Sequence, residues 1–143
     1  MFSKLFRYEV KLNLVIIVVV FMVYLFNQLV LKQLTWHFFV HWYINDILAA
    51  PLLLGYSNIL LALSPYKLRI AGLGPVLLFM LVVGLFWEVV TPLYKPTSVG
   101  DPWDLVAYLT GGGIYLIAFR ALSRTQLFLE RVIYRHSGVK EGV

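Results

Sequence analysis

Four long apolar stretches constrain this chain more than any other feature of its sequence. They cover approximately residues 12–31, 44–63, 75–92 and 104–120. About 20 apolar residues in a helix are enough to cross the hydrocarbon core of a bilayer. Hydrophobic residues make up 61% of the chain and charged residues only 13%, whereas a soluble domain is nearer one half and one quarter. We therefore predict an all-α integral membrane protein, a single domain over 1–143 built as a bundle of four transmembrane helices.

The first apolar stretch is predicted to be a retained helix rather than a signal peptide. Leu12–Leu31 is longer than a signal core, and no small-x-small cleavage site follows it. The chain also has no cysteine, which excludes disulfides, thiolate catalysis and cysteine metal sites.

Basic residues predict the orientation in the membrane. If both termini lie on one side, the other side carries only Lys32 and Lys95 of the 12 Lys and Arg residues. The positive-inside rule then places both termini in the cytoplasm. The net charge of +5 is concentrated at the termini and in one loop, which indicates lipid contact rather than nucleic-acid binding.

Residues of about 121–135 are predicted to form a separate amphipathic helix after the fourth span. Leu122, Leu129 and Ile133 follow one side, and Arg124 and Arg131 follow another. Such a helix either lies on the anionic inner leaflet or contacts another protein, a second copy of this chain included.

Polar side chains gather toward the outer leaflet in this orientation, and they come from all four stretches: Asn27, Gln28, Asn45, Asp46, Glu88, Asp101, Asp104 and Tyr108. A charge at the bilayer centre costs about 2.5 to 3.5 kcal/mol on insertion scales, and less near the interface. Glu88 is the strongest functional candidate, because it lies near a helix C-terminal end, where the helix dipole opposes a negative charge.

The aspartates also have structural interpretations. Asp101 precedes Pro102 and is typical of an N-cap, and Asp104 is placed to serve both as a first-turn residue and in a site. Asp46 is either a residue that starts the second helix, where Asn45 is another capping candidate, or a site residue. Gly111–Gly113 indicates close helix crossing, with a backbone ligand site as the alternative.

The connector from Lys32 to Tyr43 is polar and aromatic, and we expect it along the membrane interface. His37 and His41 are four residues apart and would share a helix face. That spacing suits two ligands of a metal, but no His-Glu-x-x-His pattern accompanies it, so an interfacial role is favoured.

Several features together resemble the VanZ-like family of small membrane proteins. They are Glu88, an Asp-led span with Asp101 or Asp104, the glycines Gly111 and Gly112, and Asp46 after Asn45. The resemblance covers about Asn45 to Tyr115. It implies a bacterial inner-membrane protein with a role in the cell envelope. This chain has Lys95 where the family often has a loop arginine, and Tyr108 where it often has an asparagine.

Several functions fit this pattern. An acidic pocket at the outer leaflet would bind a cell-envelope lipid or precursor. Asp46, Glu88 and Asp104 would hold Mg²⁺ or Ca²⁺ there. Lys95 or the histidines would then contact an anionic group of the ligand. An enzyme would use Glu88 and Asp104 as acid and base. The alternatives are a small secondary transporter and a non-catalytic accessory subunit or homo-oligomer.

Overall fold

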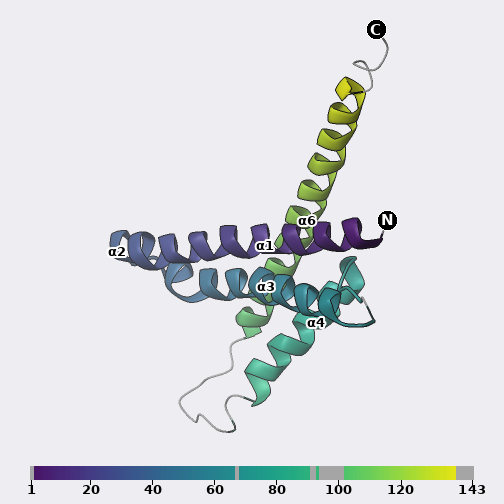
Figure 1. Cartoon of the computed structure of the whole chain (residues 1–143). Helices are drawn as coiled ribbons and strands as arrows, with labels where there is room; N and C mark the ends of the chain where they lie inside the picture. Colours follow the sequence, from purple (N-terminus) through teal and green to yellow (C-terminus); the bar gives the residue numbers. More distant parts are fainter. Residues whose placement is uncertain (1, 67, 91–92, 94–101, 138–143) are drawn as a thin grey trace.

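The computed structural model of the chain describes residues 2–66, 68–90, 93 and 102–137, with side chains described from 7 to 125 within those ranges (Figure 1). The described parts are helical and contain no strand. The elements in order are α1 (Phe2–Phe26), the π-helical turn η1 (Asn27–Leu31), α2 (Lys32–Leu34), α3 (Phe38–Leu63), α4 (Leu73–Leu85), the π-helical turn η2 (Phe86–Val90) and α6 (Pro102–Ser137).

Four helical segments are long and apolar enough to cross a membrane, which confirms the prediction of four such helices. They are Arg7–Leu34, Phe38–Leu63, Leu73–Val90 and Pro102–Thr125. The outward surface of α1 and η1 is apolar, with Leu14, Val18 and Met22 on α1 and Leu29 on η1 each more than half exposed. Exposed apolar patches of this extent are typical of surfaces that contact lipid or another protein.

The second helix begins earlier than predicted. It starts at Phe38, directly after the extended residue His37, and its first turn is aromatic rather than polar. Asn45 and Asp46 therefore lie about two turns inside α3, so the interpretation of either residue as an N-cap is wrong. An N-cap accepts hydrogen bonds from the free backbone amides in the first turn of a helix. Asn45 and Asp46 follow that first turn, so they cannot cap the start of α3.

The fourth helix continues well past the predicted end of its span. α6 runs unbroken from Pro102 to Ser137 and projects beyond the other helices (Figure 1). Between Gly113 and Gly138 the sequence has no glycine or proline to end it. The structure therefore does not show the separate amphipathic helix that was predicted for about 121–135.

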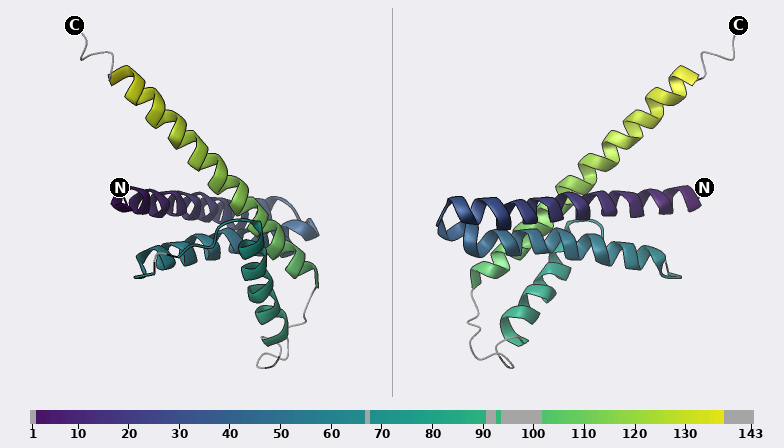
Figure 2. Two further views of the ribbon diagram at one scale, coloured as in Figure 1. Left: turned by 90° about the vertical axis from the view of Figure 1, so that its right-hand side faces the viewer. Right: turned by 60° about the vertical axis from the view of Figure 1, so that its left-hand side comes forward.

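The helices form two pairs that cross. α1 and α3 run side by side in opposite directions, and α4 and α6 lean across them (Figures 1 and 2). Fully buried side chains fill the crossing, among them Ala50, Leu54, Val76 and Met80. This apolar core separates two groups of polar residues that both involve α6.

Two glycines allow the close approach of α6 to its neighbours. A Cβ at Gly111 would collide with the Ile47 carbonyl oxygen and would lie 2.8 Å from the Ala50 Cβ on α3. A Cβ at Gly84 on α4 would lie 2.6 Å from Leu105 Cδ1. The packing interpretation of the glycine run is therefore confirmed at Gly111.

Candidate functional site

Tyr108 contacts Asp46, one of the acidic residues that the sequence singled out. Its hydroxyl donates a hydrogen bond of 3.3 Å to Asp46 Oδ1, which joins α6 to α3. Tyr108 is only 8% exposed, because its ring packs over Gly84 on α4. The missing Cβ at Gly84 thus makes room for the residue that organises the site.

Asp46 contacts this hydroxyl, and two further carboxylates lie within electrostatic range of it. The charges of Asp46, Asp104 and Glu88 all lie close enough to act on the Tyr108 hydroxyl group. They come from α3, α6 and η2 respectively. We refer to Asp46, Glu88, Asp104 and Tyr108 as the acidic site.

Glu88 occupies a distorted part of its helix. It lies in the middle of η2, where α4 passes into a π-helical turn, and its side chain is half-buried. It makes no hydrogen bond or ion pair with any other residue that the structure describes. Single π-helical turns are frequently found at functional sites, because they turn a side chain away from the regular helical register.

The second π-helical turn carries another group of the predicted polar residues. Asn27 and Gln28 begin η1, and their amide groups donate to Asn45 Oδ1 at 3.3 and 3.1 Å. Asn27 is fully buried, yet its Oδ1 has no hydrogen-bond partner among the described residues. Asn45 is next to Asp46, so this unsatisfied acceptor belongs to the same end of the molecule as the acidic site.

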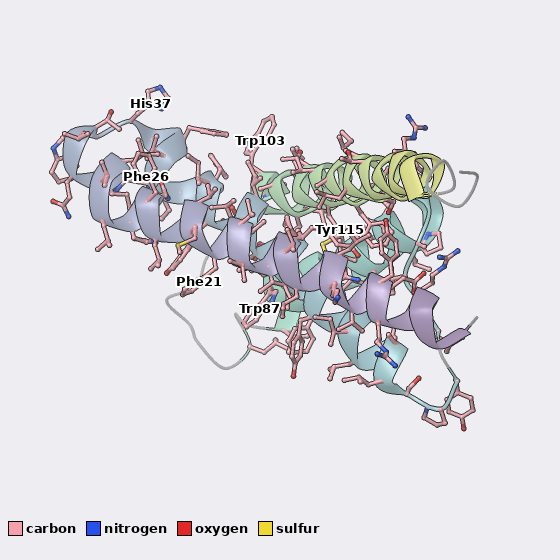
Figure 3. The ribbon with its side chains drawn as sticks, turned by 45° about the horizontal axis from the view of Figure 1, so that its top comes forward. Phe21, Phe26, His37, Trp87, Trp103 and Tyr115 are labelled. Carbon is pink, nitrogen blue, oxygen red and sulfur yellow. The ribbon has the colours of Figure 1, made fainter. Side chains whose placement is uncertain are left out.

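The two histidines do not act as a pair. His41 Nε2 lies 2.9 Å from the Thr35 carbonyl oxygen, and its ring stacks on Trp36 at 5.6 Å. His37 is exposed and projects from the tip of the hairpin (Figure 3). Trp36, Phe38, His41 and Trp42 instead line an open aromatic groove, which suits the headgroup level of a membrane.

The described part of the chain contains no group of three or more His, Asp or Glu side chains that is placed to hold a metal ion. The structure therefore gives no support to a preformed metal site at Asp46, Glu88 and Asp104. Lys95 and Asp101, the other predicted binding residues, lie outside the described residues.

A second polar cluster was missed from the sequence. The Tyr115 hydroxyl donates to Asn13 Oδ1 at 2.7 Å and accepts from Asn58 Nδ2 at 2.8 Å. Asn58 also holds the backbone of Ile70, accepting from its N–H at 2.6 Å and donating to its carbonyl at 3.1 Å. We call Asn13, Asn58, Tyr115 and the Ile70 backbone the amide–tyrosine network.

This network lies inside the molecule, where Tyr115 is 2% exposed (Figure 3). Two signals in the sequence pointed toward it. Asn13 is a polar residue within an otherwise apolar stretch, and Tyr115 follows Tyr108 by seven residues and so shares its helix face. A polar group in a membrane helix needs a partner, and each of these residues provides one for another.

Comparison with known protein families, with curated proteins and with solved structures finds no match to this chain.

Proposed function

We propose that the acidic site binds, or acts on, the polar headgroup of a cell-envelope lipid or precursor at the outer leaflet of a bacterial cytoplasmic membrane. Both chain termini then lie in the cytoplasm. The observation that carries the proposal is the hydrogen bond from Tyr108 on α6 to Asp46 on α3, with Glu88 and Asp104 within electrostatic range of the same hydroxyl. Residues that merely ended their own helices would have no reason to meet.

The chemistry of the site favours a ligand that donates hydrogen bonds. Ionised carboxylates only accept hydrogen bonds, and Glu88 has no donor among the described residues. An ammonium group or several hydroxyl groups would supply that donor. A bare phosphate would be repelled.

A divalent cation offers a second way to bind an anionic headgroup. Mg²⁺ is usually bound through one or two carboxylates together with water and phosphate oxygens. In that form one or two of the carboxylates would bind the cation and the headgroup would supply the phosphate oxygens.

If the site also catalyses a reaction, Glu88 is its acid or base. It is half-buried and has no described partner, whereas Asp46 accepts the Tyr108 hydrogen bond. Carboxylates in different environments are commonly divided between proton transfer and electrostatic stabilisation. An envelope role is also what the resemblance to the VanZ-like family implies.

A matched pair of lipids tests the proposal. Phosphatidylethanolamine and phosphatidylcholine share a phosphate, but only the first has N–H donors. We expect the purified full chain to bind the first at least about tenfold more tightly in native mass spectrometry, since each hydrogen bond to a carboxylate is worth about 1.5 to 3 kcal/mol. Glu88→Gln should remove this preference. The control is Glu130→Gln, which removes a carboxylate that is not part of the acidic site and should keep the preference.

The other outcomes are also informative. Binding of phosphatidylglycerol that requires Mg²⁺ and is lost in Glu88→Gln would establish the cation-bridged form. Release of a headgroup that stops in both Glu88→Gln and Asp104→Asn would show catalysis. If no lipid distinguishes the parent protein from Glu88→Gln with or without Mg²⁺, the proposal is wrong.

A small secondary transporter is the second candidate, and the amide–tyrosine network favours it. Polar groups now lie on both sides of the apolar core, with Tyr108 and Tyr115 on the same face of α6. Between them Gly111 packs tightly against Ala50, which closes the route in this conformation. Uptake of a cation or carboxylate by liposomes that contain the protein would support transport, and no uptake would exclude it.

A further inference from the structure

A cavity of about 170 Å³ opens beside the amide–tyrosine network, away from the acidic site. This is several times the volume of a water molecule in the liquid, about 30 Å³. Three charged residues line it: Glu9 from α1, Arg69 from the loop before α4, and Arg120 from α6. We call this cavity the basic pocket.

The charges in the basic pocket do not cancel. Arg69 Nη1 lies 2.8 Å from Glu9 Oε1, so these two form an ion pair. Arg120 makes no hydrogen bond or ion pair with any other residue in the described ranges. The pocket therefore has one excess positive charge, and most N–H donors of its two guanidinium groups remain available.

The network beneath the pocket holds Arg69 in position. Ile70, the next residue, is fixed through both its N–H and its carbonyl by Asn58. The polar atoms of Asn58 and the Tyr115 hydroxyl are already engaged in these bonds and in the bond to Asn13. A ligand is thus left with the guanidinium groups as its main polar contacts.

We propose that the basic pocket binds a phosphate group, through Arg69 and Arg120. Guanidinium groups match the geometry of phosphate oxygens and bind them in a bidentate manner. The apolar Leu116 and Phe119 also line the pocket, which suits the start of a lipid's acyl chains. The proposal concerns a different part of the molecule from the acidic site and does not depend on it.

The source of the phosphate is either an anionic lipid or a free phosphate ion. Arg7 and Lys11 are exposed at the same end, close to where the Tyr8 hydroxyl donates to the Ser123 carbonyl at 3.1 Å. Clusters of basic residues attract anionic leaflets by about 1 kcal/mol per residue near the surface. Both sources present the same chemistry to the two arginines.

The test uses the delipidated full chain in detergent. Native mass spectrometry measures binding of phosphatidylglycerol and of diacylglycerol, which lacks the phosphate, and a thermal shift measures binding of inorganic phosphate. Arg120→Gln should weaken phosphatidylglycerol binding at least about tenfold. Arg124→Gln, an exposed arginine one turn further along α6, should change it less than about twofold, since a single surface contact contributes little.

Glu9→Gln is the variant that separates binding from folding. It frees Arg69 from its ion pair, so it should tighten phosphate binding while it removes a structural contact. Inorganic phosphate that stabilises the parent and not Arg120→Gln would identify a soluble ligand, and a response to phosphatidylglycerol alone would identify a lipid. Equal losses in Arg120→Gln and Arg124→Gln, equal binding of diacylglycerol, or no binding of either phosphate would overturn the proposal.

Discussion

The acidic site and the amide–tyrosine network lie on the same face of α6, yet they differ in how their polar atoms are satisfied. In the network, Tyr115, Asn58 and Asn13 pair with one another and with the Ile70 backbone. In the acidic site, the Tyr108 hydroxyl donates one hydrogen bond to Asp46. The network is complete without a ligand, whereas Glu88 in the acidic site has no hydrogen-bond or ion-pair partner among the described residues.

The two regions also differ in how regular their backbone is. Asn58 and Tyr115 lie within regular stretches of α3 and α6, whereas Glu88 and Asn27 lie in the π-helical turns η2 and η1. A buried network with every member satisfied makes a fold rigid and specific. Irregular backbone that carries unsatisfied acceptors is what a ligand site requires. The network thus satisfies its own polar atoms, whereas Glu88 and the Oδ1 of Asn27 have no hydrogen-bond partner among the described residues.

Removing a member of the network should give the largest loss of stability. Asn58→Leu deletes three hydrogen bonds and leaves the Ile70 N–H and carbonyl without partners. We expect a loss of about 3 kcal/mol in the free energy of unfolding, measured by denaturation in mixed detergent micelles. Glu88→Gln should lose no more than about 0.5 kcal/mol. Similar losses in the two variants would remove the distinction between the two regions.

The next largest loss of stability is expected at Gly111, where α6 packs tightly against α3 between the two regions. Gly111→Ala would push α6 away from Ile47 and Ala50, and we expect it to destabilise the protein by about 2 kcal/mol. Gly113→Ala is the matched control, because a Cβ there has no atom within 4 Å. It should be neutral or stabilising by about 0.5 to 1 kcal/mol, since alanine favours helix. Equal thermal shifts in the two variants would contradict the tight crossing.

A smaller effect is expected from the tyrosine of the acidic site. Tyr108→Phe loses one hydrogen bond of 3.3 Å to a half-buried carboxylate, and we expect a loss of about 1 kcal/mol or less. Tyr115→Phe removes the same hydroxyl from a buried position with two partners and should lose about 2 kcal/mol. The order of the two unfolding midpoints is the measurement, and a reversed order would contradict the comparison.

Much of the site was accessible from the sequence because its residues violate local rules. A glutamate near the end of an apolar helix is conspicuous, as are aspartates at the edge of a span. The same reasoning failed for Asn45 and Asp46 as helix starts, because the aromatic residues before them are themselves helical. Residues 121–135 are helical as predicted, but the structure does not show them as a separate helix, since nothing in the sequence breaks α6 there.

The sequence by itself determined that four helices are long and apolar enough to span a membrane, and which polar residues they carry. Hydropathy and helix length are local properties, so they can be read from consecutive residues. Only the tertiary structure decided which polar groups meet. Tyr115 bonds to Asn13 and Asn58, which are 102 and 57 residues away in the chain. Such pairs depend on how the helix pairs cross, which the close packing at Gly84 and Gly111 sets.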